Sequence, residues 1–240
     1  MIRGTTRLIA HIGYPTHTFK APLIYNPYFE HAAIDTVVVP MGCESGPYPA
    51  FLRAVFSLTN IVGALITMPH KVSTVALLDE MSPAVRIAGS CNAVRRAPDG
   101  RLQGDLFDGE GFVRGMRRKG CTLEGARALI VGAGGVGSAI AASLAAAGAA
   151  ELALFDTRAE SASGLAQRLR EHYPRLRVTT GSKDAAGYNV VVNATPLGMK
   201  EGDPLPVDVA RLEREIFVGE VVMREEMTPF LRPAQARGCR

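Results

Sequence analysis

The sequence lacks the features that mark membrane-spanning, secreted and metal-binding chains. No apolar stretch approaches the roughly 18 uninterrupted residues that a membrane-spanning helix needs, and the N-terminus has no signal-peptide pattern. The four cysteines are widely spaced, with no Cys-x-x-Cys pair and no Cys/His cluster. This spacing disfavours a disulfide framework and a structural zinc site. We therefore expect a cytoplasmic protein that holds no metal.

Positive charge exceeds negative charge only slightly, with a formal net charge of +4. The basic clusters at 95–96 and 117–119 lack the interleaved aromatic residues that favour nucleic-acid binding. They are better interpreted as a solvated basic face, which could also attract an anionic cofactor or substrate. We expect neither a nucleic-acid partner nor a membrane partner, and the sequence leaves monomer and homodimer open.

The middle of the chain carries a dinucleotide-binding pattern. An apolar run at 129–131 leads through glycines into an alanine-rich helix, which is the order of a buried strand, a tight turn and a helix N-terminus. Gly132 allows the turn, Gly134 allows the backbone to approach a pyrophosphate, and Gly137 permits close packing of helix on strand. The residues assigned to this phosphate cradle are Gly132, Ala133, Gly134, Gly135, Val136 and Gly137.

A second apolar run ends at Asp156, about 20 residues after the glycines, where a carboxylate is expected to bind the adenosine ribose. A carboxylate there hydrogen-bonds a 2′-hydroxyl and repels a 2′-phosphate, which favours NAD over NADP. Arg158 could accept that phosphate instead, although a solvated residue at a helix start is the simpler interpretation. NAD is therefore the expected cofactor and NADP the less favoured one.

The fold class predicted from these patterns is α/β with two domains. The first hundred residues alternate strands and helices, which indicates a mostly parallel sheet, and a Rossmann-type dinucleotide domain follows. Expected strands lie at 7–12, 36–41 and 63–68, expected helices at 22–34, 49–58, 69–78 and 112–119, and an expected hairpin joins 92–94 to 102–103.

We expect a substrate-binding and catalytic domain at 1–108 and an NAD-binding Rossmann domain at 109–222. Residues 223–240 are expected to begin a C-terminal helix that returns to the substrate domain. Hydride transfer needs the nicotinamide to meet the substrate, so a cleft between two such domains is the natural architecture.

A series of motifs resembles the shikimate dehydrogenase family, in order and at suitable spacing from about residue 13 to residue 228. The matching segments are Thr67-Met68-Pro69-His70-Lys71, Gly89-Ser90-Cys91-Asn92, Asp108-Gly109-Glu110-Gly111-Phe112, Gly132-Ala133-Gly134-Gly135 and Asn193-Ala194-Thr195-Pro196-Leu197-Gly198-Met199.

The resemblance implies an NAD-dependent oxidoreductase that transfers a hydride between the nicotinamide and a ring hydroxyl or ketone of a shikimate- or quinate-like cyclic acid. Lys71 and Asp108 would form the catalytic pair, with Lys71 exchanging the hydroxyl proton and Asp108 orienting the lysine and the hydroxyl. Asn92 and Thr67 would contact the substrate. Residues Asn193, Ala194, Thr195 and Met199 would lie beside the nicotinamide, with Met199 as an apolar wall.

The substrate loop departs from the family pattern. Two serines that hold the substrate carboxylate in the family are replaced here by Phe19 and Ala21. Three further polar positions are also lost, because the residues there are Leu65, Leu106 and Phe107. Each buried polar group left unpaired costs about 1–3 kcal/mol, which weakens the expected binding of shikimate. Substitute donors are available from Thr16, Thr18, Lys20 or Tyr25, of which Thr18 and Lys20 are the strongest candidates.

Other interpretations remain open from the sequence alone. The chain stops at Arg240, short of the family's usual end, so either it is truncated or its site closes differently. With the altered substrate loop, this favours as an alternative a dinucleotide-binding regulatory or catalytically weak paralogue. A different two-domain dehydrogenase, acting on methylene-tetrahydrofolate or an amino acid, fits the motifs less well.

Overall fold

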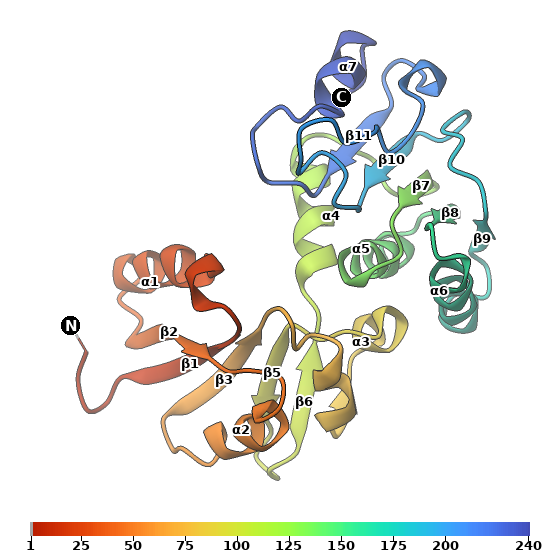
Figure 1. Ribbon diagram of the computed structural model, residues 1–240. Helices are drawn as coiled ribbons and strands as arrows, with labels where there is room; N and C mark the ends of the chain where they lie inside the picture. Colours follow the sequence, from red (N-terminus) through yellow and green to blue (C-terminus); the bar gives the residue numbers. More distant parts are fainter. Residues whose placement is uncertain (1) are drawn as a thin grey trace. The chain divides into compact units, whose positions relative to one another are not determined.

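The computed structural model describes residues 2–240 and divides the chain between Phe107 and Asp108 into two units (Figure 1). The first unit comprises residues 1–107 and the second residues 108–240. Each is an α/β unit built on its own sheet, which confirms the predicted fold class. The return of residues 223–240 to the substrate domain stays a prediction.

The first unit contains a six-stranded sheet in the order β2-β1-β3-β5-β6-β4. The pairs β1–β2, β1–β3 and β4–β6 are parallel, whereas β5 runs antiparallel to β3 and to β6. The sheet is therefore mostly parallel, and the predicted hairpin is present as β5–β6. The strands are β1 (Arg7–Gly13), β2 (Thr36–Gly42), β3 (Ile61–Ile66), β4 (Glu80–Met81), β5 (Ala93–Arg96) and β6 (Leu102–Asp105).

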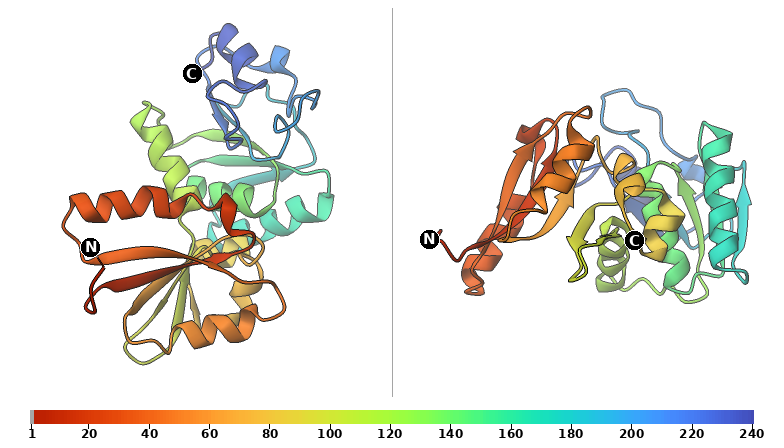
Figure 2. Two further views of the ribbon diagram at one scale, coloured as in Figure 1. Left: turned by 60° about the vertical axis from the view of Figure 1, so that its left-hand side comes forward. Right: turned by 90° about the horizontal axis from the view of Figure 1, so that it is seen from below.

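Helices α1 (Ala21–His31) and α2 (Tyr48–Val55) lie on opposite sides of this sheet (Figure 1 and Figure 2). The amide of Asn26 fixes α1 to the edge strand β2, because it accepts from Val38 N at 2.7 Å and donates to Val38 O at 3.1 Å. The side chains of Tyr48 and Leu52 anchor α2 and are fully buried. A short helix, α3 (Pro83–Ala88), follows β4.

The helix predicted at 69–78 is wrong, and Lys71 does not lie in the first turn of a helix. Residues 69–72 form turns, and only Ser73–Leu77 forms a short 3₁₀ helix. The hydroxyls of Ser73 and Thr74 both donate to the His70 carbonyl, at 3.1 and 2.8 Å. Such local side-chain bonds compete with regular helix formation, and the apolar pattern gave no sign of them.

The second unit contains a five-stranded parallel sheet in the order β11-β10-β7-β8-β9. The chain reverses its direction of strand addition between β7 and β10, which is the position where doubly wound sheets bind their ligands. The strands are β7 (Arg127–Val131), β8 (Glu151–Phe155), β9 (Arg177–Thr180), β10 (Val190–Asn193) and β11 (Phe217–Glu220). The helices are α4 (Asp108–Arg118), α5 (Gly135–Ala146), α6 (Ala159–His172) and α7 (Leu231–Ala236).

Helix α4 begins earlier than predicted, because Asp108 opens it instead of standing in a turn. A carboxylate in the first turn is favoured by the helix dipole. Helices α4 and α5 pack closely at Gly109, where a Cβ atom would lie only 2.0 Å from the Ala139 carbonyl oxygen. At the other end of the unit, Phe230 and Ala234 place α7 on the core beside β11.

Candidate dinucleotide and substrate sites

The glycine-rich loop after β7 has the geometry of a phosphate cradle. Gly132 has a φ angle of +106°, and a Cβ atom on Gly137 would lie 1.9 Å from the Gly132 carbonyl oxygen. A Cβ atom on Gly134 would meet no described residue within 4 Å, and no described side chain caps the N-terminus of α5. The loop therefore combines a glycine-only turn with open space in front of helical N–H groups, as a pyrophosphate requires.

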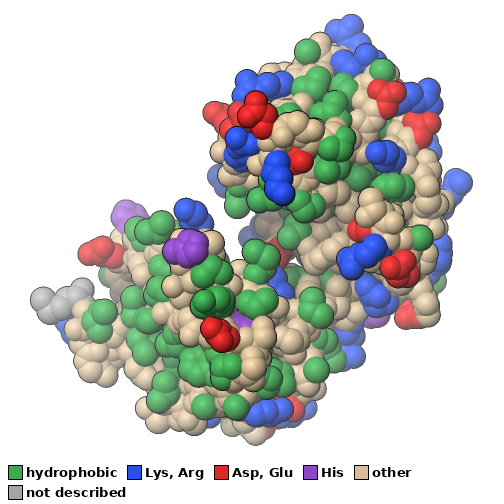
Figure 3. Space-filling model, in the orientation of Figure 1, with side chains coloured by type: hydrophobic (Ala, Val, Ile, Leu, Met, Phe, Trp, Pro, Cys, Tyr) green, Lys and Arg blue, Asp and Glu red, His purple; other side chains and the backbone are tan. Residues whose placement is uncertain are grey.

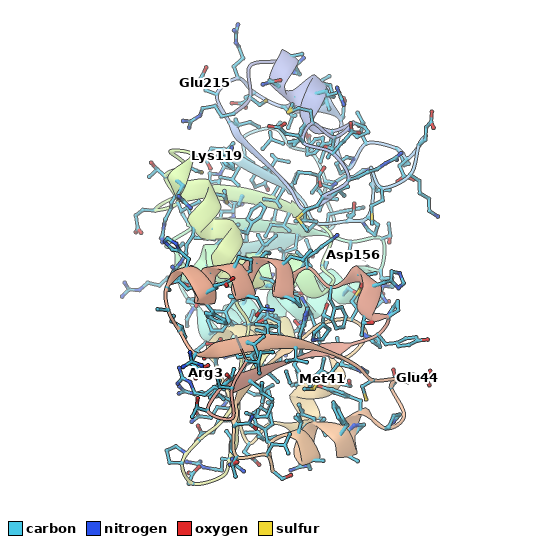
Figure 4. All side chains as sticks on the ribbon, turned by 90° about the vertical axis from the view of Figure 1, so that its left-hand side faces the viewer. Arg3, Met41, Glu44, Lys119, Asp156 and Glu215 are labelled. Carbon is cyan, nitrogen blue, oxygen red and sulfur yellow. The ribbon has the colours of Figure 1, made fainter. Side chains whose placement is uncertain are left out.

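Asp156, labelled in Figure 4, is hydrogen-bonded to this loop. Its Oδ2 atom accepts a hydrogen bond from Ala133 N at 2.8 Å, and its Oδ1 atom accepts one from Arg158 N at 2.9 Å. The side chain of Arg158 is exposed at the residue before α6. The carboxylate is thus fixed at the end of β8, next to the glycine-rich loop.

The segment from Asn193 to Met199 lies against the same loop. The Ala194 carbonyl oxygen would be 2.6 Å from a Cβ atom on Gly132, so only glycine fits there. Asn193 is fully buried, and its Oδ1 atom accepts from both the backbone N and the hydroxyl of Thr195, at 3.1 and 2.6 Å. Met199 is 58% exposed. An ordered turn that ends in an exposed methionine therefore stands beside the glycines.

In the first unit, backbone hydrogen bonds bring the ends of β1, β3 and β6 together. Thr67 N donates to Ile12 O at 2.9 Å, and Cys91 N donates to Lys71 O at 2.8 Å. The Asn92 side chain joins the same edge, because its Oδ1 atom accepts from Phe107 N at 3.0 Å. Thr67, Lys71 and Asn92, which are distant in sequence, therefore converge at one edge of the sheet.

His70 anchors the backbone next to Lys71, a role that its place in the sequence motif did not reveal. Its ring stacks on Tyr48 with centroids 3.8 Å apart, and its Nε2 atom lies 2.7 Å from the Cys43 carbonyl oxygen. The Tyr48 hydroxyl is hydrogen-bonded to Thr74 at 2.5 Å, and burial raises the pKa of Tyr48 to about 12. His70 is therefore a buried support that fixes the position from which Lys71 extends.

His11 is a further residue that the sequence did not single out. It is 94% buried in β1, its ring lies 4.1 Å from that of Phe19, and its Nδ1 atom has no hydrogen-bond partner among the described residues. Burial, and then the positive charge of Lys71, lower the pKa of His11. A lone histidine inside an apolar strand gives no sequence signal of a site, because only the fold places it near Lys71.

The substitute donors predicted in the substrate loop lie close to Phe19 in sequence but differ in their surroundings. The Thr18 hydroxyl donates to the Pro15 carbonyl at 3.0 Å, so it serves the loop itself. Lys20 is exposed and stands immediately before α1, and Ala21 is the first residue of that helix. Asp108 belongs to the second unit and Lys71 to the first, and their action as a pair stays a prediction.

Comparisons with known proteins agree with this arrangement. Residues 11–94 match the model of the shikimate dehydrogenase substrate binding domain. The shikimate dehydrogenase (NADP(+)) of Rubrobacter xylanophilus is 36% identical over 241 residues, covering 99% of this chain and 84% of that protein. The chain belongs to the shikimate dehydrogenase family. It is therefore an oxidoreductase of the shikimate and quinate type that uses a nicotinamide cofactor.

Solved structures of the family share the fold over nearly the whole chain. Shikimate 5-dehydrogenase from Listeria monocytogenes, in complex with shikimate and NAD, superposes with a TM-score of 0.92 at 27% identity and covers 100% of this chain and 86% of that one. Quinate dehydrogenase from Corynebacterium glutamicum, in complex with NAD, superposes with a TM-score of 0.85 at 30% identity. The match covers 98% of this chain and 86% of that one. Residues 116–169, from the end of α4 through the glycine-rich β7-α5-β8 unit into α6, also match the ThiF family model.

Two classes of feature are missing from residues 2–240. No helix in that range is long and apolar enough to cross a bilayer. Nor do any three His, Cys, Asp or Glu side chains in it lie together so that they could hold a metal ion.

Proposed function

We propose that this protein is an NAD-preferring dehydrogenase that interconverts a ring hydroxyl and a ketone on a small cyclic compound of the shikimate or quinate class. The observation that carries this proposal is the Asp156 carboxylate held on Ala133 N, beside the open backbone at Gly134. A fixed carboxylate there suits a ribose 2′-hydroxyl and repels a 2′-phosphate. One relative is named shikimate dehydrogenase (NADP(+)) and another was solved in complex with NAD, so the preference for NAD is argued from Asp156 and not from the relatives.

The cofactor binds to the second unit through the glycine cradle, Asp156 and the 193–199 segment. When bound, the nicotinamide ring accepts the hydride of the carbinol carbon in oxidation and returns it in reduction. Gly134 and the N-terminus of α5 supply backbone N–H groups to the pyrophosphate. Met199 offers an exposed apolar side chain, and Asn193 and Thr195 hold the turn that presents it.

The substrate binds to the first unit at the edge where Thr67, Lys71 and Asn92 converge. Lys71 accepts the hydroxyl proton at Nζ in oxidation and donates it in reduction. Asp108 orients the lysine and the reacting hydroxyl, and Asn92 positions the ring. His70 keeps Lys71 in place, because its own ring is held by Tyr48 and by the Cys43 carbonyl.

The test is absorbance of the reduced nicotinamide with shikimate and with quinate, comparing NAD with NADP. We expect NAD-dependent turnover that falls by about 10²-fold or more in Lys71→Ala and in Asp108→Asn, the range that positioned proton transfer contributes. Lys119→Ala serves as the matched control and should retain activity, because Lys119 is an exposed lysine that directly follows α4. Full activity of Lys71→Ala would remove the proposed proton-transfer role.

A second candidate is a dinucleotide-binding protein without efficient catalysis. The observation that favours it is the chemistry of Phe19 and Ala21, neither of which offers a hydroxyl to a polar substrate. Binding of NAD with no turnover of any cyclic hydroxy or keto compound in a broad panel would select this alternative.

A further inference from the structure

Residues next to the polar groups of the substrate edge carry large, exposed apolar side chains. Tyr14, Met68 and Phe107, which we call the apolar rim, are 53%, 71% and 49% exposed. Tyr14 N donates to Met68 O at 3.0 Å, and Phe107 N donates to the side chain of Asn92, so the rim is fixed to the ends of β1, β3 and β6. Apolar side chains are prominent on the face of this unit seen in Figure 3. Large exposed apolar side chains close to a few polar side chains are typical of a ligand-binding site.

Apolar groups also fill the space between Thr67 and the substrate loop. A Cβ atom on Gly13 would lie 2.4 Å from the Thr67 methyl carbon and 3.1 Å from Phe19 Cζ. The methyl group of Thr67 and the edge of the Phe19 ring therefore both lie against Gly13. Neither can donate a hydrogen bond to an anion.

The buried His11 beneath Phe19 adds no positive charge to this apolar region. The ring of Phe19 covers His11 at 4.1 Å, and burial together with the charge of Lys71 lowers the pKa of His11. At neutral pH the imidazole is uncharged and adds no second cation beside Lys71. A carboxylate placed near Phe19 would lose its hydration without gaining a charged partner from His11, which is unfavourable.

We propose that the substrate presents an uncharged, apolar portion to the apolar rim, so that this site prefers a neutral cyclic hydroxy or keto compound to the corresponding carboxylic acid. The proposal rests on the proposed function, because it names the substrate class for the same site. Thr67, Lys71 and Asn92 contact the reacting side of the ring, and Met68 and Phe107 contact the other side. Phe19, which is only 9% exposed, packs on His11 and against Gly13 and offers no hydrogen bond there.

The test compares a matched pair of ligands, shikimate and its methyl ester, which differ in the charge of one group. Dissociation constants are measured by titration calorimetry in the presence of NADH, because an alcohol and a reduced cofactor cannot react. We expect the ester to bind at least about tenfold more tightly than the acid. Equal or tighter binding of the acid, or binding of neither compound, would overturn the proposal.

Three variants assign the preference to particular residues. In Met68→Lys, a cation is added at an exposed rim position without loss of packing, and the ester-to-acid preference should fall by about tenfold. In Phe19→Leu, which keeps the site apolar, the preference should persist. In Lys20→Ala it should also persist, because the proposal gives Lys20 no part in binding a carboxylate. Selective weakening of acid binding in Lys20→Ala would identify a carboxylate site and contradict the proposal.

Turnover separates this inference from the proposed function. A preference for the ester in binding, with no NAD-linked oxidation of either compound, would refute the dehydrogenase activity and leave the apolar site standing. Oxidation of the acid with a higher kcat/KM than the ester would support the activity and overturn the apolar site.

Discussion

The side-chain amide of Asn193 donates to both carboxylate oxygens of Glu220, at 3.0 and 3.2 Å. The same carboxylate accepts from Val221 N at 2.8 Å and from the Thr228 hydroxyl at 3.1 Å. One acidic side chain at the end of β11 therefore fixes the end of β10, where the turn toward Met199 begins. This buried network holds the segment that we propose to lie beside the nicotinamide.

Removing the Glu220 carboxylate should destabilise the second unit. In Glu220→Leu the fully buried Asn193 amide keeps its bond to the Leu197 carbonyl but loses the carboxylate that accepts its other N–H, and we expect the free energy of unfolding to fall by about 1–3 kcal/mol. Glu220→Gln keeps one acceptor oxygen and should cost less. Urea denaturation measures both, with the exposed Glu171→Gln as the control. If Glu220→Leu is as stable as the control, the network does not support the fold.

The charge of Asp156 should decide the choice between the two dinucleotides. Asp156→Asn keeps an oxygen that can accept from Ala133 N but removes the charge that repels a 2′-phosphate. We expect the ratio of kcat/KM for NAD to that for NADP to fall by about tenfold or more. An unchanged ratio, with the variant folded, would show that discrimination lies elsewhere.

Two glycines in helices offer a matched test of the cradle. In Gly137→Ala the new methyl would stand 1.9 Å from the Gly132 carbonyl oxygen, and we expect a loss of about 1–3 kcal/mol together with weaker NAD binding. In Gly115→Ala, on the exposed face of α4, no described residue outside the helix backbone lies within 4 Å of the new methyl, and the change should stabilise by about 0.5–1 kcal/mol. Thermal unfolding and NAD titration distinguish the two; equal effects would contradict this packing.

The buried histidine should make stability depend on pH. Because the pKa of His11 is lowered in the folded state, the unfolded chain binds its proton first as pH falls below about 6.5. The stability contribution is therefore complete above that pH and is lost as pH falls through the folded-state pKa. Between pH 7.5 and 5.5 the free energy of unfolding should fall more in the wild type than in His11→Leu, by at most about 1.4 kcal/mol per pH unit. Parallel pH profiles for the two proteins would exclude His11 as the cause.

The sequence by itself determined most of the local elements and the chemical motifs. Short-range patterns specify them: β-branched and apolar runs gave the strands, and glycines at fixed offsets gave the turn at Gly132. The place of Asp156 at the end of β8 followed from the same pattern. These features depend on the backbone preferences of neighbouring residues, which can be seen without the fold.

The tertiary structure alone decided which side chains surround those motifs. The parallel sheet of the first unit brought Thr67, Lys71 and Asn92 to one edge, and it placed His11 under Phe19. The second sheet joined Asn193 to Glu220 across two strands. Hydroxyl bonds to His70 replaced the expected helix by a 3₁₀ turn. Each of these outcomes depends on packing or on hydrogen bonds that an apolar pattern along the chain does not encode.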